Sequence, residues 1–268
     1  MSGLSARPVS GIPEVRAGDD LAQLILAALG EQPLRDGHVV AVAHKAVSKA
    51  EGAVIALAGV RPSARAIELA RQPALVPGAG EDPRAAHCQQ QKDPRAVQVV
   101  LDQSAEVLRA DRGVLVCRTH HGYVCANAGV DASNAREPDT VIVLPRDPDA
   151  SARRIRAQLC ERSGANVAVL VSDSFGRAWR HGQLDVAIGL AGMQPLDDWR
   201  GRTDASGRHL QATWLAVADA AAASAELARA KDSREPVVIL DGLQRYVTRE
   251  DGPGAAALLR PPDEDMFR

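Results

Sequence analysis

The sequence predicts a mixed α+β fold. Segments with the apolar spacing of helices and segments rich in β-branched residues follow one another along the chain without strict alternation. No unit of roughly 20 to 50 residues is repeated, so a solenoid is not expected. Hydrophobic residues make up 46% of the 268 positions, which is enough for a sizeable buried core. We therefore expect a globular protein rather than a regular doubly wound sheet.

The elements of the first third can be taken in chain order. Residues 17–30 begin with acidic residues, have helical apolar spacing and end in glycine, so they should form a helix. The stretch HVVAVAHKAVSKAEG (38–52) should begin as a strand and enter a loop. Residues 63–71 should form another helix. Residues 72–93 are rich in Pro, Gly, Gln and charge, and should form an exposed inserted loop.

The later elements alternate irregularly between helix and strand. Helices are expected at residues 93–110, at 147–164 after an aspartate cap, and in the alanine-rich stretch 210–231. Strands are expected on both sides of a turn at Gly122 within residues 113–130, and at 140–145, 166–173 and 236–243. This irregular order is the main reason to expect an α+β protein.

Composition limits the classes of partner. A net charge of −2 gives no general attraction to nucleic acid. No apolar run approaches the roughly 18 residues of a membrane helix, and no signal peptide opens the chain, so we expect a cytoplasmic protein without a membrane partner. The four cysteines lack metal-ligand spacing and should be reduced thiols. The P-loop, dinucleotide, GxSxG and HExxH motifs are absent, so nucleotide chemistry would need a less common scaffold.

Two acidic motifs mark a candidate metal site. In VSDSFGRAWRHGQLD (171–185), an apolar strand should deliver Asp173 and Ser174 to a sheet edge and turn at Gly176. In NAGVDASN (127–134), Asp131 stands at another predicted strand end. Carboxylate and hydroxyl oxygens are hard ligands, so two converging aspartates would favour Mg²⁺ or Mn²⁺ over zinc. The alternative is that both aspartates only form turns or cap helices.

Cationic residues mark candidate phosphate contacts. Lys45 and Lys49 are four residues apart and could bind a phosphate tail, or could be an ordinary solvated pair. The acidic strand motif also carries three potential cations: Arg177, Arg180 and His181. The loop 197–213 concentrates arginines that could hold an anionic substrate or pair internally with aspartates. His120 and His121 are more typical of a turn than of a metal site.

Several ordered motifs together resemble one family. They are AVSKAEG, NAGVDASN, VSDSFGRAWRHG, DVAIGLAGMQPLDDWRGRTDASGR and VADAAAASAELA, and the similarity runs from about Gly11 to Leu243. The chain resembles the coenzyme F420-0:L-glutamate ligases, the CofE-like γ-glutamyl ligases. The resemblance implies a mixed α/β fold in which residues 1–268 form a single catalytic unit of two interlocked subdomains. It also implies an intertwined homodimer.

The resemblance further implies GTP and a divalent metal, Mg²⁺ or Mn²⁺, with K⁺ as a further candidate cation. GTP would convert a carboxylate of F420-0 to an acyl phosphate, which the amine of L-glutamate attacks; further γ-linked glutamate would follow. Asp131, Asp173 and Ser174 match metal-binding positions, and Asp131, Asp173 and Lys49 are the expected catalytic residues. The positions expected to contact the nucleotide are Ile12, Pro13, Glu14, Val15, His44, Lys45, Lys49, Asn134, Lys231, Asp232 and Ser233.

The sequence also departs from the family pattern. The family often has a polar pair where His44 and Lys45 stand, and its Met-Gly nucleotide loop reads ARAKDSREP here, which affects the second metal site. We expect no C-terminal flavin reductase domain. Two other functions remain open: a γ-glutamyl or amide ligase for another carboxylate acceptor, and a nucleotide-binding scaffold without catalysis.

Overall fold

The computed structural model of the chain describes residues 3–72, 92–111, 113–133 and 137–265. Two compact units account for them: residues 1–52 with 145–268, called unit 1 below, and residues 53–144, called unit 2. Each unit combines helices with antiparallel strands, which confirms the predicted mixed α+β class. The dimer and the interlocked subdomains remain predictions.

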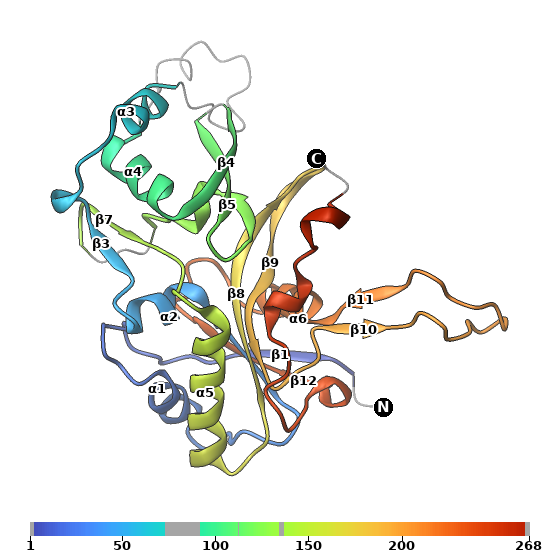
Figure 1. Cartoon of the computed structure of the whole chain (residues 1–268). Coiled ribbons are helices and arrows are strands. Elements are labelled where there is room, and N and C mark those ends of the chain that lie inside the picture. Colours follow the sequence, from blue (N-terminus) through green and yellow to red (C-terminus); the bar gives the residue numbers. More distant parts are fainter. Residues whose placement is uncertain (1–2, 73–91, 112, 134–136, 266–268) are drawn as a thin grey trace, which may run out of the picture. The chain divides into compact units, whose positions relative to one another are not determined.

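Unit 1 is built on a five-stranded sheet with the order β1-β12-β2-β8-β9 (Figure 1). The strands are β1 (Ser5–Pro8), β2 (Val39–Ala43), β8 (Ala168–Arg177), β9 (Arg180–Ala191) and β12 (Val237–Asp241). Only β2 and β8 are parallel, and the other neighbours are antiparallel. Strand β2 ends at Ala43, which pairs with Ser172 of β8, so the residues that follow β2 lie beside Asp173 of the longer strand β8.

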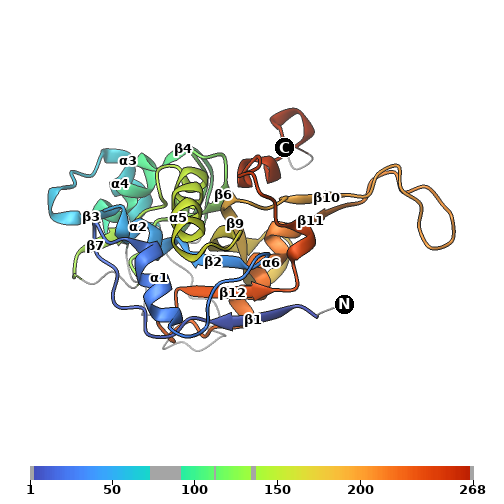
Figure 2. The same cartoon turned by 90° about the horizontal axis from the view of Figure 1, so that it is seen from below.

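Helices cover both faces of this sheet (Figures 1 and 2). The helices of unit 1 are α1 (Leu21–Leu29), α2 (His44–Ala50), α5 (Pro148–Ser163) and α6 (Val217–Leu227). The alanines of α6 pack against one face, in a buried cluster with Val39 and Leu170. The opposite face receives α5, whose Pro148 lies so close to Gly189 that any side chain there would overlap it.

A hairpin of β10 (Leu196–Asp198) and β11 (Trp214–Ala216) projects from unit 1, as Figure 1 shows. The segment predicted as an arginine-rich loop forms its outer part, which is closed by a bridge between Thr203 and His209. Internal ion pairs link Arg200 to Asp198 and Arg202 to Asp197. Most of its charged groups are therefore already partnered within the hairpin.

The described residues of unit 2 form two smaller sheets and two α-helices. The helices are α3 (Ala64–Ala70) and α4 (Pro94–Asp102), and the strands are β3 (Val54–Ala56), β4 (Ser104–Asp111), β5 (Val114–Thr119), β6 (Val124–Ala126) and β7 (Thr140–Ile142). Strands β4, β5 and β6 form an antiparallel sheet, and β3 pairs with β7. Both helices contribute to a buried core over the three-stranded sheet.

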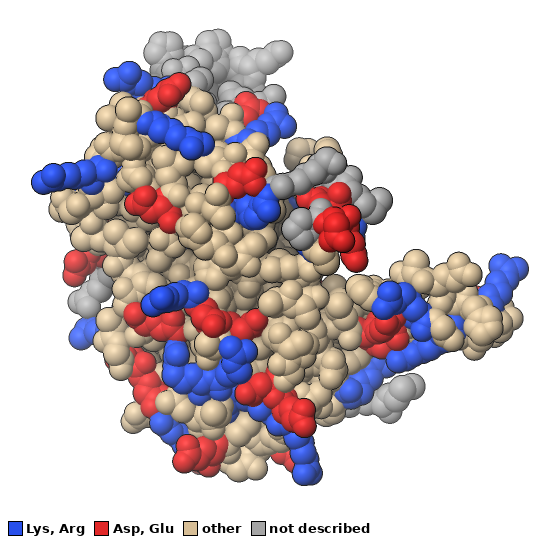
Figure 3. All heavy atoms as spheres, viewed as in Figure 1, with Lys and Arg blue, Asp and Glu red and all other residues tan. Residues whose placement is uncertain are grey.

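Short 3-10 helices also occur in the described parts of both units. They span Leu57–Gly59 and Asn127–Gly129 in unit 2, and Gln244–Tyr246, Ala255–Leu258 and Pro262–Glu264 in unit 1. Cys117, Cys125 and Cys160 form no disulfide, in agreement with the predicted reduced thiols. Among the described residues, no helix has both the length and the apolar character needed to cross a bilayer. Charges of both signs are interspersed on the face of the molecule shown in Figure 3.

Four predictions of secondary structure were wrong, either in the type of element or in its bounds. The expected loop after β2 is helix α2, and the expected turn at Gly176 lies within strand β8, which continues to Arg177. The expected helix 93–110 ends at Asp102, and the long helix 210–231 begins only at Val217. In the last two cases β4 and β11 find strand partners, and this tertiary pairing overrides the local helical pattern. Most of the predicted loop 72–93 lies outside the described residues.

Candidate active site

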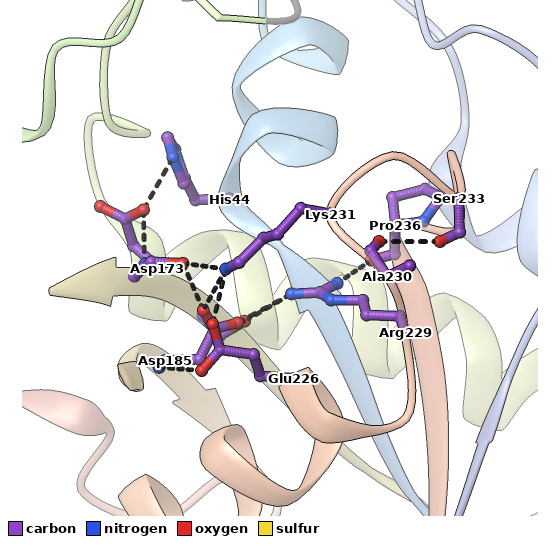
Figure 4. A network of polar contacts seen from close by, with 11 residues as sticks. His44, Asp173, Asp185, Glu226, Arg229, Ala230, Lys231, Ser233 and Pro236 are labelled. Atoms are coloured by element: carbon purple, nitrogen blue, oxygen red, sulfur yellow. Dashed lines mark hydrogen bonds and ion pairs between the residues drawn. The ribbon is translucent and has the colours of Figure 1, made fainter. Parts of the chain in front are cut away.

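Strand β8 directs neighbouring side chains to opposite faces of the unit 1 sheet. Successive residues of a strand alternate in direction, so Ser172 and Ser174 share one face and Asp173 points to the other. The partners agree with this alternation: Ser172 and Ser174 contact Asp185 of β9, whereas Asp173 contacts His44 of α2 (Figure 4). Asp173 and Ser174 therefore belong to two different polar environments.

On the first face, Asp173 is held at one carboxylate oxygen. The Nε2 atom of His44 lies 3.1 Å from Oδ1 of Asp173, and the backbone N–H of Ser174 donates to the same oxygen at 2.8 Å. The side chains of His44 and Asp173 are 3% and 15% exposed. Among the described residues, none donates a hydrogen bond to Oδ2 of Asp173. That oxygen can therefore bind a cation without breaking an existing contact.

His44 occupies this position because of the fold around it. It is the first residue of α2, which begins directly after β2, the parallel neighbour of β8. Its Nδ1 atom is buried and has no hydrogen-bond partner in the described part of the chain. The ring therefore directs its one polar contact at Asp173, with Nε2 as the donor to the carboxylate.

Lys49 lies on the same short helix and forms an ion pair. Its Nζ donates to Oε1 of Glu14 at 2.5 Å, and the Lys49 side chain is only 15% exposed. The structure thus brings the N-terminal segment Ile12–Val15 to Lys49, two regions that the sequence assigned to nucleotide binding. Lys45 is half-buried on α2. These residues and Asp173 all belong to unit 1.

On the second face, Asp185 is the centre of a buried polar network (Figure 4). Its carboxylate is 1% exposed and accepts hydrogen bonds from Ser174 Oγ at 2.5 Å and Ser172 Oγ at 2.9 Å. Arg229, which follows α6, donates from Nη2 to Oδ2 at 2.8 Å. Burial by itself would raise the pKa of the Asp185 carboxyl, but these hydrogen bonds and the charges of Arg229 and Lys231 outweigh it and lower the pKa.

Glu226 and Lys231 complete this network. Glu226 accepts the backbone N–H of Asp185 at 2.8 Å through Oε2. The Lys231 ammonium donates to Glu226 Oε1 at 2.5 Å and to Ser174 Oγ at 2.8 Å. Ser233 donates to the carbonyl of Ala230 at 3.0 Å, and Asp232 is exposed. The predicted nucleotide loop thus reaches the sheet through Lys231.

Asp131 belongs to unit 2 and has its own local contacts. Its backbone pairs with Ile142, and its carboxylate accepts from the N–H and the hydroxyl of Ser133 at 2.6 and 2.9 Å. The preceding Asn127, Ala128 and Gly129 all have positive φ angles, so the backbone turns tightly before Asp131. Its predicted meeting with Asp173 of unit 1 stays a prediction, and Asn134 lies outside the described residues.

The arginines at the end of the acidic strand motif lie at the tip of the β8–β9 hairpin. Arg177 is paired with Arg180 across the hairpin, and its guanidinium contacts the carbonyl of His181. All three residues are exposed. Arg177 is four residues beyond Asp173, which corresponds to about 13 Å along an extended strand. A ligand would have to be long to contact both.

No ready-made metal cage exists within the described residues. No group of three or more His, Cys, Asp or Glu side chains there is arranged to hold an ion. A divalent ion at Oδ2 of Asp173 would need further oxygen ligands from a bound substrate, from water or from another carboxylate. Mg²⁺ is commonly bound by one or two carboxylates together with substrate phosphates. The free oxygen of Asp173 fits such a site, in which the chain supplies only part of the coordination.

Sequence reasoning missed Asp185, Glu226 and Arg229 as members of the polar network. Asp185 stands within the acidic strand motif itself, but the expected turn at Gly176 hid its pairing with Ser174. Had the sequence been interpreted as a long β8–β9 hairpin, Asp185 would have been predicted opposite Ser174. Glu226 and Arg229 lie more than 40 residues from Asp185 along the chain, and no local pattern linked them to it.

Comparison with known proteins decides the family. The model of the F420-0:gamma-glutamyl ligases matches residues 11–242. The chain belongs to this family. The matched range includes all the site residues described above, and it agrees with the similarity that the motifs indicated.

Named relatives of this family are similar over their full lengths. The coenzyme F420:L-glutamate ligase of Methanothermobacter thermautotrophicus is 41% identical over 99% of both chains. That of Methanopyrus kandleri is 41% identical over 100% of both, and that of Halobacterium salinarum is 41% identical over 99% of this chain and 96% of its own. The chain is therefore an enzyme of the ligase class, and the prediction of a ligase is confirmed.

Proposed function

We propose that this family member joins L-glutamate to coenzyme F420-0 in a GTP-dependent reaction of coenzyme F420 biosynthesis, and can then add γ-linked glutamate. Support comes from the names of the full-length relatives, each called a coenzyme F420:L-glutamate ligase. The structural observation that carries the proposal is Asp173, a nearly buried carboxylate with one oxygen anchored by His44 and the other available to a cation.

The proposed reaction has two steps. A carboxylate oxygen of F420-0 attacks the γ-phosphorus of GTP, the bond to the bridging oxygen breaks, and GDP leaves. The glutamate amine then attacks the carbonyl carbon of the acyl phosphate, loses a proton and expels inorganic phosphate with the oxygen that the first step activated. A divalent ion, Mg²⁺ or Mn²⁺, would neutralise charge on the phosphoryl oxygens during the transfer.

The residues of unit 1 have corresponding roles in this proposal. Asp173 would hold the divalent ion through its carboxylate, which His44 keeps oriented. Lys49 contacts the phosphates, with Glu14 beside it in the nucleotide-binding segment. Lys45 lies one turn before Lys49 on α2 and can approach the same anion. Asp131 of unit 2 is the proposed second carboxylate of the metal site.

Glutamate addition is tested by mass. The protein is incubated with F420-0, L-glutamate and GTP, with Mg²⁺ or Mn²⁺ and with or without K⁺, and each added glutamate is counted. We expect no addition without a divalent ion and none by the Asp173→Asn variant, whose circular dichroism should match the parent. Asp263→Asn, an exposed aspartate, is the matched control and should retain activity.

Other outcomes would redirect the proposal. Glutamate-dependent GTP hydrolysis without any change in F420-0 would indicate a different carboxylate acceptor. Calorimetry that finds nucleotide binding unaffected by metal, together with no turnover, would favour a scaffold. Asp173→Asn with normal turnover would remove Asp173 from the mechanism.

The shared metal site can be tested by a double-mutant cycle for Mn²⁺ binding with GDP present. If Asp131 and Asp173 hold the same ion, the effects of Asp131→Asn and Asp173→Asn should not add. Additive losses would mean that the two carboxylates act on separate ligands.

We also propose the homodimer that the family resemblance predicts. Support comes from the β10–β11 hairpin, which projects from the sheet of unit 1 and carries Trp214 and Leu215, 48% and 43% exposed. Large apolar side chains on a projecting hairpin are typical of contact surfaces. Light scattering coupled to gel filtration should give twice the chain mass, and Trp214→Glu should lower it.

A further inference from the structure

Lys231 contacts the oxygens that surround Ser174. Its Nζ is 2.5 Å from Glu226 Oε1, 2.8 Å from Ser174 Oγ and 3.7 Å from Asp185 Oδ1. These are a carboxylate, a hydroxyl and a second carboxylate, the hard oxygen set that a divalent ion prefers. In this structure the three oxygens surround the ammonium group of Lys231 instead of a metal ion.

The hydroxyl of Ser174 acts both as a donor and as an acceptor in this arrangement. It donates to Asp185 Oδ1 at 2.5 Å and accepts from Lys231 Nζ at 2.8 Å. A metal ion on Ser174 Oγ would compete with the ammonium for the lone pairs of the hydroxyl. The ion and the ammonium would then repel each other across a short distance.

The charges of the network also balance without a metal. Asp185 and Glu226 are two carboxylates, and Arg229 and Lys231 are two cations that contact them. A divalent ion added to this balanced set would leave an excess of positive charge beside the 1% exposed Asp185. Such an excess is costly beside a buried carboxylate, although water screens part of it at the Lys231 side chain, which is 67% exposed. The residues present therefore do not fit the metal role that the family resemblance gave to Ser174.

We propose that the Lys231 ammonium serves as the resident cation of the Ser174 face, so that the chain binds no divalent ion there. A metal would be bound only on the opposite face of the sheet, at Asp173. This second statement rests on the proposed function, whereas the role of Lys231 follows from the contacts of Ser174. Lys231 also ties the loop after α6 to strand β8, so it is a positioning residue.

The test counts Mn²⁺ ions per chain in the full-length protein, with GDP present, by electron paramagnetic resonance of free Mn²⁺. Lys231→Ala should bind one more Mn²⁺ than the parent, because it frees the oxygens of Ser174, Glu226 and Asp185 and removes the competing charge. Arg234→Ala is the matched control: it removes one exposed cation from the same loop and should leave the count unchanged.

Ser174→Ala gives an independent test in the parent background. It should leave the Mn²⁺ count unchanged, because Ser174 holds no ion there. A loss of one Mn²⁺ in Ser174→Ala, or no gain in a folded Lys231→Ala, would overturn the proposal. Should Lys231→Ala fail to fold, the Ser174→Ala count still decides the question.

This outcome can be separated from failure of the proposed function. Glutamate addition to F420-0 by the parent protein tests the reaction, whereas the difference in Mn²⁺ count between variants tests only Lys231. A parent that adds no glutamate but shows the extra ion in Lys231→Ala would retain this inference and lose the reaction.

Discussion

His44 Nε2 and Asp173 Oδ1 lie 3.1 Å apart where β2 ends beside its longer parallel neighbour β8. This contact leaves one oxygen of a nearly buried carboxylate available to a ligand. A residue that orients a metal-binding carboxylate commonly changes metal affinity or activity by about 10–100-fold when it is replaced.

Replacement of His44 should therefore weaken the site without unfolding the chain. In His44→Phe the ring remains but the donor to Asp173 is lost, and we expect Mn²⁺ affinity and kcat/KM for glutamate addition to fall by about 10–100-fold. Ser48→Ala is the matched control, because Ser48 is buried on the same helix and its hydroxyl has no partner among the described residues. Equal effects of the two variants would assign His44 to packing alone.

Replacing only one partner of the buried Asp185–Arg229 ion pair should lower the stability of the fold. Arg229→Met removes the cation that contacts the buried Asp185 carboxylate at 2.8 Å and leaves it only the more distant Lys231 at 3.7 Å, so we expect a loss of about 3–5 kcal/mol in the free energy of unfolding. The double variant Arg229→Met/Asp185→Leu should recover a large part of this loss, because it removes both charges. Urea unfolding followed by circular dichroism measures each value. A double variant no more stable than Arg229→Met would contradict the prediction.

The same carboxylate gives stability a pH dependence. The pKa of Asp185 is lowered in the folded state, so between that value and the unfolded value of about 4 the unfolded chain binds more protons. The contribution of the carboxylate is complete above pH 4 and is lost as the pH falls through the folded pKa. The stability advantage of the parent over Asp185→Asn should therefore shrink below pH 4. A difference that does not change from pH 7 to pH 2 would exclude this linkage.

Asp219 should show the opposite behaviour. Burial raises its pKa, although the carboxylate accepts the N–H of Ala187 at 2.9 Å. Its ionised form is therefore destabilising, and the penalty develops as the pH rises from the unfolded value of about 4 through the folded pKa. Asp219→Asn keeps an acceptor for Ala187 and should have a higher Tm than the parent at pH 7. At pH 3 the two Tm values should converge; a lower Tm for the variant at pH 7 would refute the prediction.

Gly129 should be irreplaceable in the turn before Asp131. Its φ is +71°, and a Cβ there would lie 2.7 Å from Cγ of Leu144. Gly129→Ala should destabilise unit 2 by about 1–3 kcal/mol through overpacking and backbone strain. Hydrogen exchange of amides in residues 53–144 measures this locally. Gly59→Ala, with nothing within 4 Å and an ordinary φ, is the control and should exchange like the parent.

Several elements could be predicted because their signals are local. Helix α1 has Asp20 as its N-cap and Gly30 at its C-cap, and α5 has Asp147 and Gly164 in the same positions. The two strands around Gly122 were also found from their apolar pattern. In contrast, β4 and β11 have local patterns compatible with a helix, and only their strand partners decide their conformation.

The family, the ligase class, the mixed α+β fold and the position of the acidic motif with Asp173 and Ser174 could all be predicted from the sequence alone. Tertiary structure alone decided that these neighbours point to opposite faces, one toward His44 and the other toward Asp185 and Lys231. The reason is that helix caps, the spacing of apolar residues and sequence motifs all depend on residues that are close in the chain. The partners of a site depend on strand pairing and packing, which join residues such as Ser174 and Lys231 that are far apart in the sequence.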